Sequence, residues 1–203
     1  MTAEGPEARE ELRGVLVALR RRVDDHFAAA VARTPSAFAC REGCDRCCHQ
    51  RFGVFEVEAA VLREALAELE VRDPELRARV RRQADDPAHG RRCALLVDGR
   101  CAVYEARPTI CRSHGLPILA EEPAEVGAQG SRGRVDHCPL NFTDGSTPPA
   151  ASVLRLAAVN QPLAVLATLW QRAEGAGAGV GTSAESGGRV DLAALARGGL
   201  DGE

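Results

Sequence analysis

The chain of 203 residues contains no lysine and few aromatic residues. These shortages determine which side chains carry its positive charge and which can build its core. All 26 basic residues are arginines, a composition typical of a GC-rich genome that favours Arg codons. Aromatic residues make up only 3% of the chain while hydrophobic residues make up 45%, so a core must be built mainly from Leu, Val and Ala. Sequences rich in Ala and Leu with charged residues between them usually form helices.

The sequence also lacks an excess of one charge and any long apolar run. The net charge of -3, from 26 basic and 29 acidic residues, gives no general attraction to nucleic acid or to an anionic membrane. No segment approaches the roughly 18 apolar residues of a membrane span, and the polar N-terminus lacks the apolar core of a secretory signal. We therefore expect a cytoplasmic protein without nucleic-acid or membrane partners, in a compartment where thiols stay reduced.

Apolar residues that recur at helical spacing predict a mainly helical α+β fold. The expected helices cover residues 7–33, 56–71, 74–85 and 153–170. Asp73 is a suitable N-cap because proline follows it at the first helical position. Asn160 and Pro162 favour a division of the last helix into two short ones.

We expect a single domain over residues 1–173. It would comprise the N-terminal helix, a cysteine-rich core over residues 37–141 and C-terminal helices over residues 151–173. Residues 174–203 are predicted as a flexible tail rich in Gly, Ala and Ser, with a short helix over residues 191–197. Residues 120–136 are expected to form an irregular loop.

Asp98-Gly99 between two apolar segments predicts the one β-hairpin of the fold. In a regular two-residue hairpin Cys101 would face Leu96, and Cys93 would point to the opposite side of the strand. We expect both cysteines in one site, so either the turn is bulged or the strand begins after Cys93. The Arg-Pro pair that follows predicts a short turn or helix that carries Cys111.

Eight cysteines with the spacing of metal ligands are the most informative feature of the sequence. Four of them lie within nine residues in the pattern Cys-x3-Cys-x2-Cys-Cys, at Cys40, Cys44, Cys47 and Cys48. The others follow at Cys93, Cys101, Cys111 and Cys138. Buried cysteines acting as small apolar residues would explain one or two scattered thiols, but not four in a polar segment. In a reduced compartment the pattern predicts a metal centre of thiolates, in one or two four-cysteine sites.

Soft thiolates select zinc or iron, the latter also as an iron–sulfur cluster, and the spacing leaves the choice open. Four thiolates around one divalent ion leave a charge of about -2, which needs compensation when it is buried. We expect Arg107 and Arg112 to donate hydrogen bonds to sulfur. His49 and His137 each adjoin a cysteine and could replace a thiolate, and His114 could donate to sulfur.

Three segments resemble a known family: CREGCDRCC at residues 40–48, CAVYEARPTICR at 101–112 and HCPLN at 137–141. They are similar to the cysteine-cluster proteins named for a CxxCxxCC signature, a zinc- or iron-chelating family that includes the YkgJ group. The first spacing here is one residue longer than the name implies. The resemblance spans residues 37–170 and implies metal chelation. One branch of the family resembles flagellin lysine methylases, which are longer than this chain.

Two other functions compete with simple metal binding. The spacing of Cys40, Cys44 and Cys47 equals that of radical SAM enzymes, but Arg46 and the fourth cysteine depart from that signature, and the alternation of strands and helices in a β/α barrel is missing. Two interpretations stay open: another iron–sulfur or metal-dependent enzyme, and a structural zinc module that presents a surface to an unidentified protein. No catalytic triad order, phosphate loop or dinucleotide fingerprint is found, so we do not expect another enzyme class.

Overall fold

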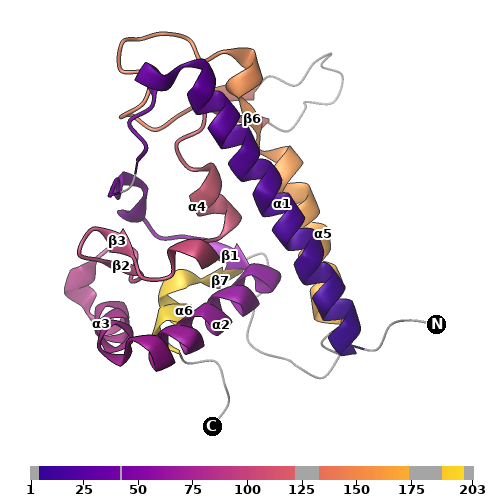
Figure 1. The fold of residues 1–203 in the computed structure, drawn as a ribbon, viewed down its shortest axis with the longest axis vertical. Coiled ribbons are helices and arrows are strands. Elements are labelled where there is room, and N and C mark those ends of the chain that lie inside the picture. The colour runs from indigo at the N-terminus through magenta and orange to yellow at the C-terminus, as the bar shows by residue number, and fades with distance from the viewer. Residues whose placement is uncertain (1–4, 42, 122–132, 174–188, 199–203) are drawn as a thin grey trace.

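The computed structural model describes residues 5–41, 43–121, 133–173 and 189–198. Its longest helix, α1 (Gly5–Arg33), lies beside α5 (Ala157–Ala173), and the two form one side of the molecule (Figure 1). Leu16 and Leu19 of α1 pack in one apolar cluster with Leu163 and Trp170 of α5. Helix α1 ends before Pro35 because a residue that precedes proline avoids the α region.

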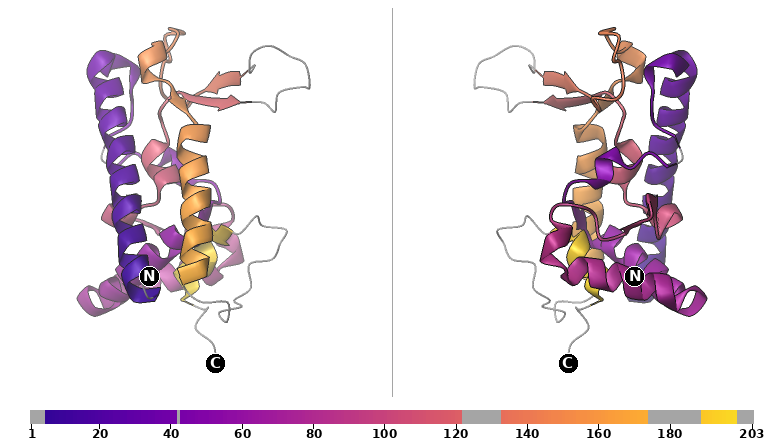
Figure 2. Two further views of the ribbon diagram at one scale, coloured as in Figure 1. Left: turned by 90° about the vertical axis from the view of Figure 1, so that its right-hand side faces the viewer. Right: turned by 90° about the vertical axis from the view of Figure 1, so that its left-hand side faces the viewer.

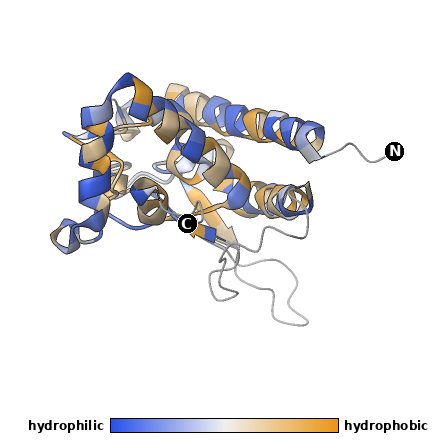
Figure 3. Ribbon diagram, turned by 90° about the horizontal axis from the view of Figure 1, so that it is seen from below, coloured by the Kyte–Doolittle hydropathy of each residue, from blue (hydrophilic) through white to orange (hydrophobic). Residues whose placement is uncertain are grey.

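The lower part of the molecule is formed by α2 (Glu56–Arg72), α3 (Pro74–Asp85) and α6 (Leu192–Arg197). The predicted cap of α3 is confirmed, because the Asp73 carboxylate accepts a hydrogen bond from Leu76 N at 2.9 Å. Asp191 caps α6 in the same way, and Gly198 ends this helix with a φ of 79°. Figure 3 shows from below that hydrophilic and hydrophobic residues are interspersed along the helices.

The mainly helical α+β class is confirmed, but the described strands form three small sheets rather than one hairpin. β1 (Gly53–Phe55) pairs antiparallel with β7 (Arg189–Asp191), so residues 189–191 return to the segment just before α2. A three-stranded sheet joins β4 (Ile118–Glu121), β5 (Gly133–Asp136) and β6 (Leu154–Arg155) in the order β5-β4-β6. Figure 2 shows β4 and β5 projecting from the body of the molecule.

Two sequence-based expectations about these segments are wrong. Residues 120–136 are not all irregular, because both ends of this segment belong to the β4–β5 pair, whose register sets Ile118 opposite Asp136; residues 122–132 lie outside the described part of the chain. Helix α5 is also not divided at Asn160. Pro162 is its sixth residue and removes one main-chain donor near the helix start, so the helix continues through it.

The predicted hairpin is present as β2 (Leu96–Val97) and β3 (Arg100–Cys101). Asp98 and Gly99 have φ angles of 50° and 75°, the positive values that a type I′ turn requires. The bulged alternative is therefore wrong, since Leu96 pairs with Cys101 in a regular two-residue hairpin. The other alternative is confirmed: the strand begins at Leu96, and Cys93 precedes it in a turn closed by Leu96 N and Cys93 O at 3.0 Å.

Short helical segments complete the fold and carry much of the cysteine-rich core. They are α4 (Thr109–Ser113) and the 3₁₀ helices η1 (Pro35–Ala37), η2 (Arg46–Cys48), η3 (Pro87–His89), η4 (Tyr104–Ala106) and η5 (Ala150–Ser152). Segments this short are not stable alone, so tertiary contacts must hold them in place. None of the described helices combines the length and apolarity needed to cross a membrane.

Two apolar clusters flank the cysteine-rich core, and α2 contributes to both. Leu62, Leu66 and Leu69 pack with α3, the hairpin and α6, and Cys93 and Cys101 lie against this cluster. Val57 instead belongs to the cluster between α1 and α5. Because α2 belongs to both clusters, it fixes the two halves of the fold on either side of the cysteines.

Candidate metal centre

A cavity of about 400 Å³ lies between α1, the segment before β1, the hairpin and α4. Seven of the eight cysteines line it: Cys40, Cys44, Cys47, Cys48, Cys93, Cys101 and Cys111. They come from chain segments up to about 70 residues apart that the fold brings together. Seven of the eight cysteines therefore lie in one region of the fold.

Burial raises the pKa of the Cys93 and Cys101 thiols, while nearby main-chain amides act against that rise. The Cys93 sulfur accepts hydrogen bonds from the main-chain amides of Leu95 and Leu96, and the Cys101 sulfur accepts one from Val103. Burial raises the pKa of Cys93 to about 11, and the two amide bonds act against that rise. Amides directed at sulfur stabilise an anionic ligand, which is the form that binds metal.

Cys47 and Cys48 are consecutive residues of η2 and contact each other. A hydrogen bond from the Cys48 thiol lowers the pKa of Cys47 to about 7, and the Arg107 guanidinium acts in the same direction. The same bond, followed by burial, raises the pKa of Cys48. The main chain ties this pair to the hairpin segment, because Cys93 N donates to Cys48 O at 2.7 Å.

Cys40 is positioned by two residues that the sequence analysis did not single out. The buried Asn141 donates to the Cys40 sulfur at 3.4 Å and to Gly115 O at 2.7 Å, and its side-chain oxygen accepts from Ala39 N at 2.8 Å. Gly115 has a φ of 104°, and a Cβ there would lie 2.5 Å from the Cys40 sulfur. The sequence did offer a hint of this role, because Asn141 is the last residue of the HCPLN segment that resembles the family.

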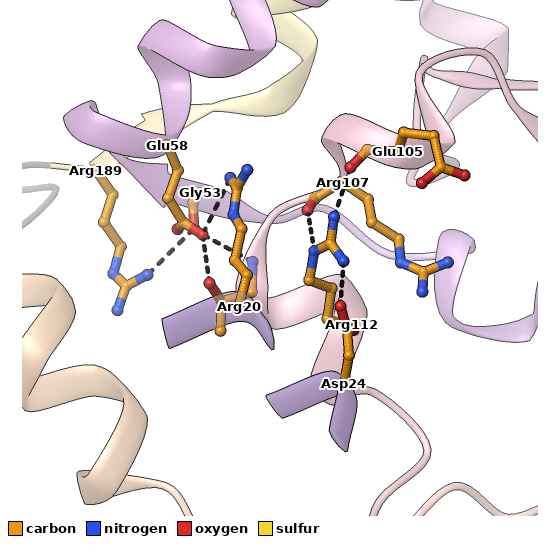
Figure 4. A network of polar contacts seen from close by, with 9 residues as sticks. Arg20, Asp24, Gly53, Glu58, Glu105, Arg107, Arg112 and Arg189 are labelled. Atoms are coloured by element: carbon orange, nitrogen blue, oxygen red, sulfur yellow. Dashed lines mark hydrogen bonds and ion pairs between the residues drawn. The ribbon is translucent and has the colours of Figure 1, made fainter. Parts of the chain in front are cut away.

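Cys111 lies on α4, whose first residue is fixed by a buried ion pair (Figure 4). The Glu58 carboxylate accepts from Thr109 N at 2.7 Å and from the Thr109 hydroxyl at 2.8 Å, while Arg20 lies 3.7 Å away. Two Arg20 nitrogens, Nε and one terminal nitrogen, are buried without a hydrogen-bond partner. Burial lowers the pKa of Arg20, and Glu58 opposes this change. This pair connects α1, α2 and α4 directly behind Cys111.

The two arginines predicted to bond sulfur have different surroundings. Arg107 lines the cavity. After the hydrogen bond from Cys48, its charge helps to lower the pKa of Cys47, and it opposes the rise that burial causes in the pKa of Cys101. Its guanidinium lies 3.9 Å from the centre of the Tyr104 ring, and its buried Nε has no hydrogen-bond partner.

Arg112 donates to oxygen atoms: to Arg107 O at 2.9 Å, to the Asp24 carboxylate at 2.6 Å and to Glu105 O (Figure 4). These bonds hold the loop before Cys111. A bond from either arginine to sulfur stays a prediction.

Three histidines were considered as ligands or sulfur partners. His114 lines the cavity and is held by Gln50 at 3.3 Å and by the Phe52 ring. Burial lowers the pKa of His114, so its imidazole is neutral at pH 7. His49 pairs with Asp45 at 3.3 Å, and His137 lies 3.1 Å from Cys138 O.

Cys138 is the one cysteine outside the cavity lining, yet it is close to Cys40. Its thiol raises the pKa of Cys40, after burial as the main cause. Among the residues that the structure describes, no group of three or more His, Cys, Asp or Glu side chains is arranged to hold a metal ion. The sulfurs therefore surround the cavity instead of converging on one point, and the ligand role of each cysteine stays a prediction.

Comparison with known proteins supports the resemblance seen in the motifs. Residues 39–127 match the family model CxxCxxCC, described as "Putative zinc- or iron-chelating domain". No curated protein and no solved structure matches the chain. The matched segment is shorter than the expected resemblance over residues 37–170, and Cys138 lies beyond it. Residues 39–127, with seven of the eight cysteines, thus match the model of the CxxCxxCC family.

Proposed function

We propose that the protein binds zinc or iron through the thiolates of its cysteines. The observation that carries the proposal is the single cavity lined by seven cysteines from three separate segments of the chain. A closed site of four thiolates suits zinc and also serves iron–sulfur clusters. The amides directed at Cys93 and Cys101 and the positive charge of Arg107 beside Cys47 stabilise the anionic ligands that such a site needs.

Metal analysis after purification without oxygen tests this proposal. We expect a stoichiometric amount of zinc in a colourless sample, or iron with acid-labile sulfide in a brown sample with broad visible absorption. Cys111→Ser keeps the size of the side chain but weakens the ligand, so its metal content should fall. A folded wild-type protein that carries neither metal, and that takes up neither after reduction and reconstitution, contradicts the proposal.

A metal-dependent enzyme is the second candidate, and the volume of the cavity favours it. About 400 Å³ leaves room beside the sulfurs for a small molecule, and the unpartnered Nε of Arg107 could donate to its anionic group. A centre with an exchangeable ligand should change its visible or cobalt-substituted spectrum when cyanide or azide is added. An unchanged spectrum favours a closed site whose metal serves the fold.

A further inference from the structure

A second cavity lies between α2, α3 and α6, in the lower part of the molecule (Figure 1). Its volume of about 350 Å³ is in the range of small-molecule sites. It shares no lining residue with the cavity that the cysteines line, so the proposed metal binding gives it no role. Part of its wall is apolar and consists of Leu66, Ala67, Val71, Ala194 and Leu195.

The charged residues of this second cavity carry more positive than negative charge. Arg63, Arg77 and Arg81 line it together with a single carboxylate, that of Glu70. Arg63 has a partner outside the lining, because it donates to Glu56 at 2.6 Å. Among the described residues, Glu70 is the only carboxylate that pairs with Arg77 or Arg81. The two guanidinium groups therefore share one negative charge.

Arg81 already engages both oxygens of Glu70. Its Nη1 donates to Glu70 Oε1 at 2.9 Å, and its Nη2 pairs with Oε2. Arg77 Nε lies 3.7 Å from the same Oε2, which is beyond hydrogen-bond distance. The incompletely balanced charge is therefore that of Arg77, although its side chain is only 3% exposed. A charge buried to this extent normally requires a close partner.

The end of α6 leaves space beside both guanidinium groups. Gly198 lines the cavity, and a Cβ at this residue would lie 2.9 Å from Arg77 Nη2 and 3.9 Å from Arg81 Nε. Arg77 is held in place from the other side, because its Nη1 donates to Ala196 O at 2.6 Å. Burial lowers the pKa of Arg77, and the charge of Arg81 acts in the same direction. An anion beside the two groups would offset both effects.

We propose that this cavity binds a small carboxylate with an apolar chain, whose head lies against Arg77 and Arg81 and whose chain packs on Leu66 and Leu195. Guanidinium groups present forked donors that match the two oxygens of a carboxylate. Because Glu70 leaves one positive charge unbalanced, a singly charged head suits the site better than a doubly charged phosphate. The site does not depend on metal, so it goes beyond the proposed function.

Calorimetric titration of the full chain with octanoate tests this proposal, with acetate as the ligand that lacks the apolar chain. We expect octanoate to bind and acetate to bind at least about tenfold more weakly, since it buries less apolar surface. Arg81→Gln should weaken octanoate binding by about tenfold or more. Arg79→Gln is the matched control and should leave binding unchanged: Arg79 lies on the same helix with the same 44% exposure, but it pairs with Asp98 and does not line the cavity.

Glu70→Gln gives an expectation of opposite sign. It removes the carboxylate that competes for the two guanidinium groups, so octanoate should bind more tightly than to the wild-type protein. A purely structural role of the arginines predicts no such gain, and this variant therefore carries the test if Arg81→Gln protein does not fold by circular dichroism. No binding of octanoate at millimolar concentrations, equal affinities of the Arg81→Gln and Arg79→Gln proteins, or weaker binding by Glu70→Gln protein would overturn the proposal.

Discussion

At the scale of single residues, the position of Cys40 depends on a glycine and on the side-chain amide of an asparagine. Gly115 leaves the space that the Cys40 sulfur occupies, and Asn141 bonds that sulfur together with Gly115 O and Ala39 N. Asn141 is almost completely buried, so its polar atoms must find partners inside the protein. The position of one candidate ligand is thus determined by residues about 75 to 100 positions away in the sequence.

Gly115→Ala should therefore displace Cys40. The new methyl group would lie 2.5 Å from the sulfur, and alanine is strained at a φ of 104°. We expect a loss of about 1–3 kcal/mol in the free energy of unfolding and a lower metal content per chain. Gly14→Ala is the control, since nothing lies within 4 Å of its Cβ in α1; alanine there should raise stability by about 0.5–1 kcal/mol. Full metal content in Gly115→Ala protein would show that Cys40 is not a ligand.

At the scale of elements, the buried Arg20–Glu58 pair decides where α4 begins. A helix of five residues has no stability of its own, and here a carboxylate from α2 accepts both the amide and the hydroxyl of Thr109. Arg112 adds bonds to Asp24 of α1 and to the preceding loop. The direction in which α4 presents Cys111 is therefore set by α1 and α2.

Glu58→Ala should destabilise the protein by about 3–5 kcal/mol, because it leaves Arg20 as a buried charge without its partner. At about 2–4 °C per kcal/mol, a thermal melt should show a fall of roughly 6 °C or more. Glu64→Ala is the matched control on the same helix: its pair with Arg13 is exposed, and its loss should cost less than about 1 kcal/mol. Equal melting temperatures for the two variants would contradict this role of Glu58.

At the scale of the whole molecule, the candidate ligands come from several short segments that lie far apart in the sequence. Residues 43–48 contain only the short η2, the hairpin strands have two residues each, and Cys138 follows the projecting β5. Metal bound by cysteines from all of these segments would link metal binding to folding.

Removal of metal should therefore lower the melting temperature. At free metal 100 times above its dissociation constant, binding contributes about 2.7 kcal/mol, which corresponds to roughly 5–10 °C for a chain of this size. The measurement is a thermal melt under reducing conditions, with and without a strong chelator, with metal loss confirmed by mass spectrometry. An unchanged melting temperature after confirmed metal loss would rule out a structural role for the metal.

The helices and the hairpin could be predicted because their signals are local. Asp73 before Pro74 marked a helix start, and Asp98-Gly99 marked the turn, each within a few residues of the feature it determines. Expectations failed where distant pairing decided the outcome. β4 and β5 pair across a long connection, and β1 pairs with β7 from the far end of the chain, so no local pattern announces these strands.

The sequence by itself determined the helical class, the eight thiols and, through its motifs, the resemblance of residues 39–127 to the CxxCxxCC family. These properties depend on residue types and on the spacing of residues that are close in sequence, and both can be read from the linear chain. The tertiary structure alone decided which thiols are neighbours, that Asn141 bonds Cys40 and that Glu58 fixes the start of the Cys111 helix. Such contacts join residues 50 to 100 positions apart, and burial gives them their strength, so they exist only once the helices have packed.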